Sequence, residues 1–457
     1  MNITANKSHL FAKWMSYIFL LISLILLIYT YYRAEIYYAG ASTMYFKYYV
    51  ISLFGIIFWI SVLLMPSGVR ANIVTLVTSI VICLYFIEIG LTYFQIQEPD
   101  ARERSREASK LGIEYDKRTK FEVIEDLIES GEDAVPSMGP KHSLSSAEKI
   151  LPLGGISNKT TVATNENGYF MIYRSDRYGF NNPDSEWDVL PIEWLLTGDS
   201  FTEGLAVRPG EDIAGQIRAL SNESVINLGR SGNGPLMELA ELKEYAEVIK
   251  PKKVIWLYYE ENDLRDDINR DKKNPFLMQY LNDEFSQNLI NKQIEIDQLL
   301  VDHLIEFKEQ ASLGKTRWIR LYKLRELIGF DRDKNRANEV ITELKVDIED
   351  PIFSNILSSA KKRVESWDGQ LYFVYLPEYD RYAIKDIASE SYRSKAEVLK
   401  IVKTLQIPII DIDKNVFSVL SDPLALFPFG KKGHYNANGY SEVAKEIVRS
   451  VKKHDKN

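Results

Sequence analysis

Several separate blocks of this sequence carry side chains that could perform nucleophilic chemistry, and the first of them contains Ser200. This serine lies in Gly-Asp-Ser, directly after the run IEWLLTG at 192–198. A strand that ends in such a turn exposes a serine hydroxyl where a substrate can approach it. The same residues also fit a plain turn, in which Asp199 and Ser200 satisfy backbone donors. Gly-Asp-Ser alone therefore leaves both interpretations open.

A general base for Ser200 must come from only five histidines. His434, in GHYNANGY, precedes a helical pattern that begins at Tyr440 and closes the chain. A histidine in this loop could fold back over the end of a strand and take the serine proton. Alternatively, His434 is a helix-entry residue, with Asn436 and Asn438 as caps. The other histidines lie in the N-terminal segment, a linker, an insertion and the tail: His9, His142, His303 and His454.

Two further blocks offer groups that could stabilise an oxyanion. Gly232 lies among the closely spaced glycines of NLGRSGNGP at 227–235, where the backbone can approach a ligand and its amide could donate a hydrogen bond. Asn262 follows the apolar run at 253–259, and its side-chain amide would be a second donor. Taken singly, each residue also fits a turn or a cap. The glycine segment lacks the spacing and the Lys-Ser/Thr ending of phosphate-binding loops, which disfavours a nucleotide site.

The strands of a parallel sheet would have to bring these blocks together. Short and nearly continuous apolar runs occur at 192–198, 224–229, 253–259, 370–377 and 407–412. Such runs are typical of strands buried on both faces, and helical patterns lie between them. The alternation predicts a doubly wound α/β domain over 187–457, whose ligands bind at the carboxyl ends of the strands. The charged segment 264–349 is longer than a crossover needs, and we interpret it as a helical insertion.

The N-terminal region 1–97 is interpreted as a membrane anchor. Three stretches, at about 14–31, 48–65 and 73–94, are long and apolar enough to be transmembrane helices. Lys7 and Lys13 before the first stretch and Arg70 between the second and third favour an extracytoplasmic C-terminal domain, although Arg33 and Lys47 oppose this orientation. Residues 98–150 are expected to be a charged linker, and residues 151–186 a small strand-and-turn element.

Charge and cysteine content exclude several classes of protein. The net charge is −8 and no dense basic run with interleaved aromatic residues occurs, so nucleic acid is not an expected partner. Cys83 is the only cysteine, which excludes an intrachain disulfide framework and a cysteine-based zinc site. Asp263, Asp266, Asp267 and Asp271 lack the glycine and the closing glutamate of a calcium-binding loop. We therefore expect neither a metal nor a cofactor.

The order Ser200, Gly232, Asn262, His434 resembles that of the SGNH (GDSL-type) hydrolase superfamily, over roughly 187–453 apart from the insertion. The resemblance implies that Ser200 is the nucleophile and His434 the general base. It also implies that the Ser200 amide, the Gly232 amide and the Asn262 side chain form an oxyanion hole. The fold implied is a flavodoxin-like three-layer αβα sandwich with a parallel sheet, which agrees with the alternation of strands and helices.

Two positions depart from the family pattern. Glu260 stands where the third block usually has glycine, and Lys431 stands where the last block usually has the aspartate that orients the histidine. The candidates for a substitute acid are Asp411, Asp413 and Asp422 or a carboxylate elsewhere in the chain. Otherwise Ser200 and His434 act as a dyad, with a backbone carbonyl orienting the imidazole.

The segments SDRYGFNNPD (175–184) and GHYNANGY also resemble membrane-anchored SGNH proteins associated with bacterial surface polysaccharides. This narrower resemblance implies that Arg177 and the neighbouring loop shape the substrate site. Asp199 is a further candidate substrate-binding residue. The expected function is that of a multi-pass membrane protein that cleaves an acyl or acetyl ester, on a glycan, through an acyl-enzyme. Its expected partners are the lipid bilayer and the acylated substrate. One alternative is an O-acyltransferase that works with a multispanning membrane acyltransferase, and another is a catalytically inactive module that binds glycan or acts as a scaffold.

Overall fold

The computed structural model describes residues 3–37, 42–93, 99–139, 150–312, 321, 324–325, 351–384 and 390–455. The chain divides into two units, Met1–Ile96 with Ala311–Arg332, and Gln97–Gln310 with Asp333–Asn457. Much of the insertion expected at 264–349 lies outside the described residues. Its described part contains short helical turns and the helix α12 (Gln293–Ser312).

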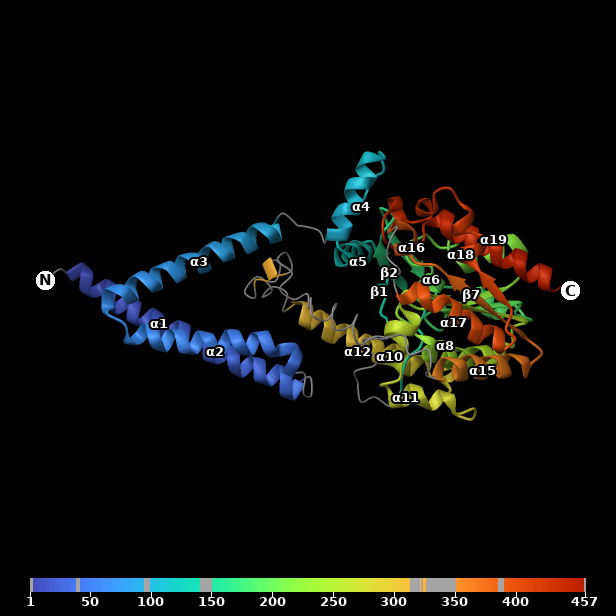
Figure 1. Ribbon diagram of the computed structural model, residues 1–457, viewed down its shortest axis with the longest axis horizontal. Coiled ribbons are helices and arrows are strands. Elements are labelled where there is room, and N and C mark those ends of the chain that lie inside the picture. Colours follow the sequence, from blue (N-terminus) through green and yellow to red (C-terminus); the bar gives the residue numbers. More distant parts are fainter. Residues whose placement is uncertain are drawn as a thin grey trace. The chain divides into compact units, whose positions relative to one another are not determined.

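The first unit contains three long apolar helices, α1 (Ile3–Tyr31), α2 (Ser42–Leu64) and α3 (Ser67–Tyr93), shown in blue in Figure 1. Within them, Ser8–Tyr31, Tyr45–Leu64 and Ser67–Leu91 are long and apolar enough to cross a membrane. A small core joins the helices, in which Phe19 stacks on Trp59 at 4.7 Å between ring centroids. Most other large apolar side chains of these helices face outward, as is typical of helices that lie in lipid. The three expected spans are therefore confirmed as helices of suitable length and composition.

The second unit is built on a five-stranded parallel sheet in the order β5-β4-β6-β7-β8. In chain order the strands run 2-1-3-4-5, which is the flavodoxin-like arrangement. The polypeptide reverses the direction of winding after β5, which puts the switch point between β4 and β6, and ligands of such sheets bind at the carboxyl ends of the strands near that point. The strands are β4 (Trp194–Gly198), β5 (Val225–Asn227), β6 (Lys253–Tyr259), β7 (Gln370–Leu376) and β8 (Ile409–Asp411).

Two apolar cores, one on each face of the sheet, make the unit a three-layer sandwich. Leu195 and Trp256 belong to the core that α8 and α15 cover, whereas Leu196 and Leu257 belong to the core that α7 and α19 cover. This alternation along each strand explains why the strands are apolar at nearly every position. Figure 1 shows α19 and α15 on opposite sides of β7, and the expected αβα fold is confirmed. The covering helices are α7 (Ile213–Ser221), α8 (Pro235–Glu241), α15 (Ile352–Glu365), α17 (Glu390–Thr404) and α19 (Ala437–His454).

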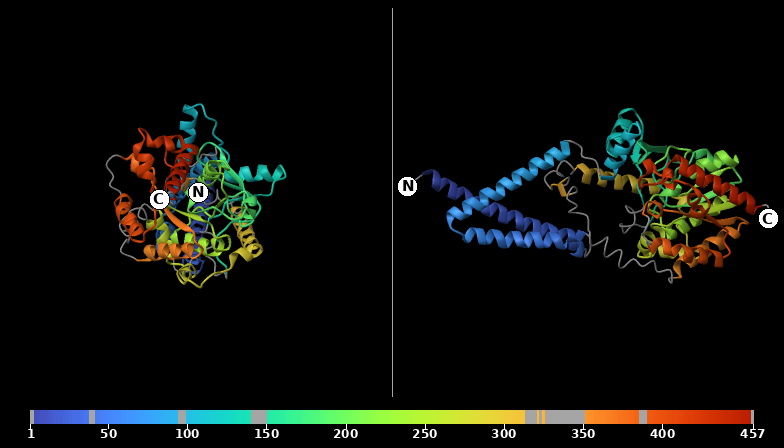
Figure 2. Two further views of the ribbon diagram at one scale, coloured as in Figure 1. Left: turned by 90° about the vertical axis from the view of Figure 1, so that its right-hand side faces the viewer. Right: turned by 45° about the horizontal axis from the view of Figure 1, so that its top comes forward.

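A second, three-stranded sheet precedes the sandwich in sequence. Its strands are β1 (Ala134–Pro136), β2 (Thr160–Asn165) and β3 (Phe170–Arg174); β1 is parallel to β2, and β2 is antiparallel to β3. Helix α5 (Lys120–Glu129) packs Val123 and Ile124 against Ala134 and Val162 of this sheet. Figure 1 shows α5 beside β1 and β2, and the preceding helix α4 (Pro99–Lys110) projecting away from them in cyan; Figure 2 gives two further views of this unit.

The segment interpreted as a charged linker at 98–150 is therefore partly folded. This charged segment contains the amphipathic helix α5. Thr119 and Glu122 form a reciprocal capping box at the start of this helix. Strand β1 has only three residues, too few to show a periodic pattern in the sequence. The small sheet combines this segment with the strand-and-turn element expected at 151–186, because β1 pairs with β2.

Candidate active site

Ser200 lies at the carboxyl end of β4, where the strand turns into the short helix α6 (Ser200–Glu203). Asp199 caps this helix, because its Oδ1 accepts a hydrogen bond from the Phe201 amide at 2.9 Å. The turn needs glycine at position 198, since a Cβ there would lie 2.1 Å from Thr202 Oγ1. The turn leaves Ser200 partly exposed at the edge of the sheet, while Asp199 and Phe201 are buried.

His434 lies within hydrogen-bonding distance of this serine, with 2.8 Å between its Nε2 and Ser200 Oγ. The histidine follows the 3-10 turn η12 (Pro428–Gly430) and precedes α19. Asn436 starts α19 by accepting a hydrogen bond from the Gly439 amide at 2.9 Å. The imidazole also packs on the ring of Phe201, with 4.7 Å between the centroids. The structure thus brings together two residues that are 234 positions apart in the chain.

The other side of the imidazole contacts Glu166, a residue that the sequence did not single out. His434 Nδ1 lies 3.0 Å from Glu166 Oε1, and the His434 amide donates to Glu166 Oε2 at 2.7 Å. Glu166 is buried in the turn between β2 and β3 of the small sheet. An ionised carboxylate only accepts hydrogen bonds, so Nδ1 carries the proton and Nε2 is left to accept the Ser200 hydroxyl. Ser200, His434 and Glu166 therefore form a continuous hydrogen-bonded row.

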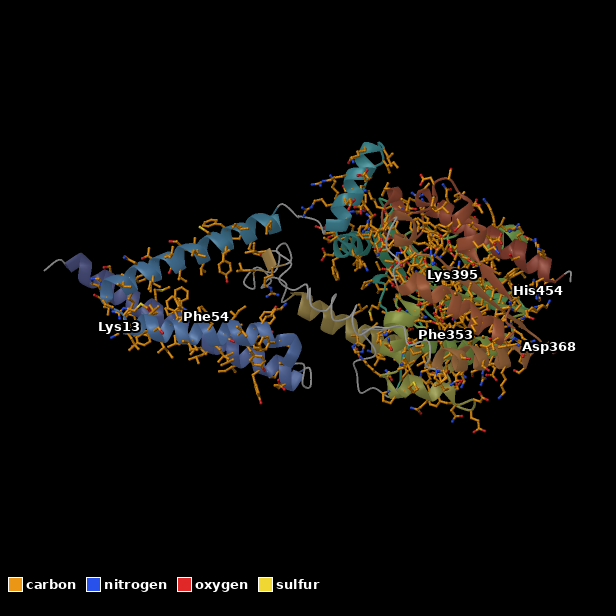
Figure 3. All side chains as sticks on the ribbon, in the orientation of Figure 1. Lys13, Phe54, Phe353, Asp368, Lys395 and His454 are labelled. Carbon is orange, nitrogen blue, oxygen red and sulfur yellow. The ribbon has the colours of Figure 1, made fainter. Side chains whose placement is uncertain are left out.

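Among the alternatives for an orienting acid, it is a carboxylate from elsewhere in the chain, Glu166, that lies beside His434 Nδ1, and not Asp411, Asp413 or Asp422. Asp411 accepts hydrogen bonds from Lys395 Nζ at 2.8 Å and from the Lys414 amide at 3.0 Å. Asp413 accepts bonds from Lys395 and from the hydroxyls of Tyr382 and Ser418. Lys395 is labelled in Figure 3. Asp422 stands at the start of the 3-10 turn Pro423–Leu426. Asp411 and Asp413 stabilise the end of β8, while the Nδ1 position of His434 is taken by Glu166.

Gly232 and Asn262 lie in the loops that follow the two strands flanking β4. The loop after β5 is tied to α6, because Asn227 Nδ2 donates to the Thr202 carbonyl at 2.7 Å and the Ser231 amide donates to Glu203 Oε2 at 2.6 Å. Gly232 has a φ of +85°, a conformation that favours glycine. These ties bring the Gly232 loop alongside the turn that carries Ser200.

The Asn262 side chain is held by two carboxylates. Its Nδ2 donates to Asp267 Oδ2 at 2.8 Å and lies 3.5 Å from Asp199 Oδ2. The second distance is at the outer limit of a hydrogen bond, so one N–H is firmly engaged and the other only weakly. Asp199 is also 3.4 Å from Ser200 Oγ. It therefore links the nucleophile turn to the Asn262 loop from a buried position.

The charges around His434 favour its protonated form. Burial alone would lower the pKa of the imidazole, but the charge and hydrogen bond of Glu166, with smaller contributions from Asp199 and Glu203, raise it above the ordinary value. For Glu166, burial would raise the pKa, and the charge and hydrogen bonds of His434 instead lower it. Burial raises the pKa of Asp199, opposed by its hydrogen bonds. Glu166 is thus ionised at neutral pH and stabilises an imidazolium when one forms.

The two departures from the family pattern have structural partners. Glu260 is buried, and its carboxylate is paired with Arg381 and accepts hydrogen bonds from the Tyr375 hydroxyl and the Glu378 amide. It therefore joins the ends of β6 and β7. Lys431 Nζ pairs with Glu103 of α4 at 2.9 Å. Both residues thus form ion pairs. Glu166 takes the place beside His434 of the acid that Lys431 replaces.

Arg177 is engaged in a structural role. Its guanidinium donates to the carboxylates of Asp184 and Asp188 and to the Asp184 carbonyl, at distances of 2.8–3.2 Å. These bonds engage Nε, Nη2 and one of the two N–H groups of Nη1. Elsewhere in the unit, Arg270 pairs with Asp267 and Asp271. Over the described residues, no group of three or more histidine, cysteine or acidic side chains is arranged to hold a metal ion.

Comparison with known proteins finds similar solved structures of low sequence identity. No family model and no curated protein matches it. Among solved structures it is similar to a putative lipolytic protein of the G-D-S-L family from Desulfitobacterium hafniense, with 12% identity, 56% of this chain and 98% of that chain covered, and a TM-score of 0.30. It is also similar to the lipase/acylhydrolase from Enterococcus faecalis, with 13% identity, coverages of 57% and 97%, and a TM-score of 0.32. A third match is an acetyl-xylooligosaccharide esterase from Geobacillus, with 14% identity, coverages of 57% and 94%, and a TM-score of 0.33. The likeness is one of fold, and the roles of individual residues depend on the geometry described above.

Proposed function

We propose that this protein is a serine esterase anchored in a membrane, with Ser200 as nucleophile, His434 as general base and Glu166 as the acid that orients the base. The observation that carries the proposal is the row of contacts at 2.8 Å between Ser200 Oγ and His434 Nε2 and at 3.0 Å between His434 Nδ1 and Glu166 Oε1. These distances meet the requirement that a nucleophile and its base be in hydrogen-bond reach, with a third group orienting the base.

In the proposed first half-reaction, Ser200 Oγ attacks the carbonyl carbon of the ester as its proton passes to His434 Nε2. The ester C=O becomes an oxyanion, which the Ser200 and Gly232 amides and the Asn262 side chain would stabilise. The weakly held N–H of Asn262, 3.5 Å from Asp199, is the one that could turn toward this oxygen. Collapse of the intermediate breaks the ester C–O bond, and His434 returns the proton to the leaving alcohol. Ser200 then carries the acyl group.

In the second half-reaction, a water molecule gives a proton to His434 and attacks the acyl-enzyme. The bond between the acyl carbon and Ser200 Oγ then breaks, and His434 returns its proton to this oxygen. The products are the free acid and the restored Ser200 hydroxyl, so the protons balance over the cycle. Glu166 remains ionised throughout and stabilises the imidazolium formed in both halves. If a sugar hydroxyl replaced water as the acceptor, the same row of residues would perform acyl transfer.

The finer part of the proposal is that the substrate is an acyl or acetyl ester on a glycan, reached on the extracytoplasmic side. Support comes from the resemblance of SDRYGFNNPD and GHYNANGY to membrane-anchored proteins of surface polysaccharides, and from the distribution of basic residues around the apolar stretches. Measuring glycan acetylation in a strain that lacks the protein tests this part. A gain of acetyl groups supports hydrolysis, whereas a loss identifies transfer to the glycan.

The nucleophile is tested with the Ser200→Ala variant of the full-length protein in detergent, using p-nitrophenyl acetate as substrate. We expect hydrolysis to be abolished, and labelling by a fluorophosphonate probe to be lost with it. Ser450→Ala is a matched control, because that hydroxyl bonds Glu446 on α19 and has no contact with the row. Undiminished turnover by Ser200→Ala would refute the assignment. An unaltered protein that resists the probe would instead indicate an inactive binding module.

A further inference from the structure

The segment at 99–116, which includes α4 and follows the membrane anchor in sequence, contacts both loops that form the His434–Glu166 pair. On the histidine side, Glu103 Oε1 pairs with Lys431 Nζ at 2.9 Å, and Arg104 Nη1 donates to the Lys432 carbonyl at 3.3 Å. Lys431 and Lys432 immediately precede Gly433 and His434. Helix α4 thus holds the backbone just before the proposed general base.

The end of the same segment holds the turn that carries Glu166. The Asp116 amide donates to the Gly168 carbonyl at 2.8 Å, and Asn165 Nδ2 donates to the Asp116 carbonyl at 2.8 Å. The Tyr115 hydroxyl donates to the Asn165 carbonyl at 3.3 Å. The residues on both sides of Glu166 are therefore tied to Tyr115 and Asp116.

Tyr115 also connects the two loops with each other. Its ring lies 6.3 Å from the ring of Phe429, which belongs to the turn before His434. A Cβ on Gly168 would lie 2.8 Å from the Glu114 carbonyl oxygen and 3.7 Å from the Phe429 ring, so the packing in this region is close. One continuous segment therefore contacts the Glu166 turn and the His434 loop at several points.

Arg104 acts on this pair through its charge as well as through its hydrogen bond. It is one of the cations that lower the pKa of Glu166, after the larger effects of burial and of His434. It also hydrogen-bonds Tyr115, whose pKa burial raises. The other charged or titratable groups that face the pair are Asp199 and Glu203 next to His434, and the phenol of Tyr440 next to Glu166.

We propose that the segment 99–116 is a positioning element of the active site, in which Arg104 and Tyr115 hold the Glu166 turn against the His434 loop. The inference rests on the proposed esterase function. Glu166 and His434 are 268 positions apart. Glu166 lies in a turn of the three-stranded sheet and His434 in the loop before α19, so their mutual geometry depends on how these two loops are joined. The family pattern supplies its acid three residues before the histidine, whereas this chain uses a remote glutamate and adds a segment that fixes it in place.

The test compares Arg104→Gln with Arg106→Gln in the full-length protein, with p-nitrophenyl acetate as substrate. Arg106 is exposed on the same helix and its loss changes the net charge equally. We expect kcat of Arg104→Gln to fall about ten- to a hundredfold because misplacing a catalytic group by about 1 Å has effects of this size, with KM little changed. Arg106→Gln should stay within about twofold of the unaltered protein, since surface substitutions have small effects.

The pH profile separates positioning from a general loss of structure. The positive charge of Arg104 opposes protonation of His434. Removing this charge should therefore move the acidic limb of the profile, where kcat/KM falls as His434 becomes protonated, to higher pH. Arg104→Lys keeps the charge, so its acidic limb should stay where the unaltered protein has it. Tyr115→Phe keeps the ring and loses one neutral hydrogen bond, and its kcat should fall about two- to tenfold. Thermal unfolding of each variant shows whether it is folded. If Arg104→Gln is not folded, the test uses Arg104→Lys and Tyr115→Phe instead.

Three outcomes are decisive. Reduced kcat with a shifted acidic limb in Arg104→Gln supports the inference. The inference is overturned if Arg104→Gln and Tyr115→Phe have the same kcat and pH profile as Arg106→Gln. If Ser200→Ala is inactive in the same assay, the esterase assignment stays intact. An unaltered protein that neither hydrolyses the ester nor reacts with a fluorophosphonate overturns the proposed function and this inference together.

Discussion

Replacement of Glu166 by glutamine tests the least expected member of the site. Glutamine has nearly the same shape, and one of its two head-group atoms can still accept the His434 amide that now donates to Oε2 at 2.7 Å. The other atom is then an NH₂ group, which donates to His434 Nδ1 and forces the ring proton onto Nε2. At 2.8 Å from Ser200 Oγ, a protonated Nε2 cannot accept the serine proton.

The expected loss follows from this change of tautomer. The equivalent acid-to-amide change in a serine protease triad lowers kcat by about 10⁴, which corresponds to about 5 kcal/mol of transition-state stabilisation. We therefore expect kcat/KM of Glu166→Gln for p-nitrophenyl acetate to fall by about 10³–10⁴, while the melting temperature changes little. Glu132→Gln is the matched control, because Glu132 is exposed beside the same small sheet and bonds Thr160 instead of His434. A loss below about tenfold in folded Glu166→Gln would show that Ser200 and His434 act as a dyad without need of this carboxylate.

Three further predictions follow from contacts in the same unit. The pKa of His434 is raised above 6.5, and the imidazole acts as a base only when it is neutral. In a pH–rate profile, kcat/KM should therefore fall as the pH drops through a value above 6.5. In Glu166→Gln this fall should occur at lower pH. Asn262→Ala should lower kcat by about 10²–10³ by removing an oxyanion donor, and an unchanged kcat would exclude Asn262 from that role. Glu260→Ala should lower the free energy of unfolding by about 3–5 kcal/mol, because the largely buried Arg381 loses its closest carboxylate. Chemical denaturation measures this free energy, and a change below about 1 kcal/mol would contradict the prediction.

The parts of the site that the sequence indicated share one physical property, which is that they follow strands of one parallel sheet. Ser200 and Asn262 each come shortly after a run that is apolar enough to be identified as a buried strand. Parallel strands place such ends at one edge, so their convergence follows from the class of fold. The pairing of His434 with Ser200 could be expected for a similar reason, since few histidines were available and only this one precedes the closing helix.

Glu166 could not be found in this way. It lies in the turn NENGY between two short strands, and such a turn favours polar residues whether or not they act in chemistry. Its sheet is separate from the sheet that carries Ser200, so no rule of strand order relates the two. The acidic residues that most closely precede His434 in sequence, Asp411, Asp413 and Asp422, were the natural candidates, yet two of them proved to be engaged at the end of β8.

By itself, the amino-acid sequence determined the three apolar helices, the alternation of strands and helices, and the turn that exposes Ser200. These features depend on side chains near one another in the chain, where periodicity, chain length and the absence of a Cβ act directly. The tertiary structure alone decided which carboxylate meets His434 and that the segment 99–116 joins the two loops. Contacts between distant surface loops depend on how separately formed sheets pack together, and nothing in the local pattern of either loop specifies its partner.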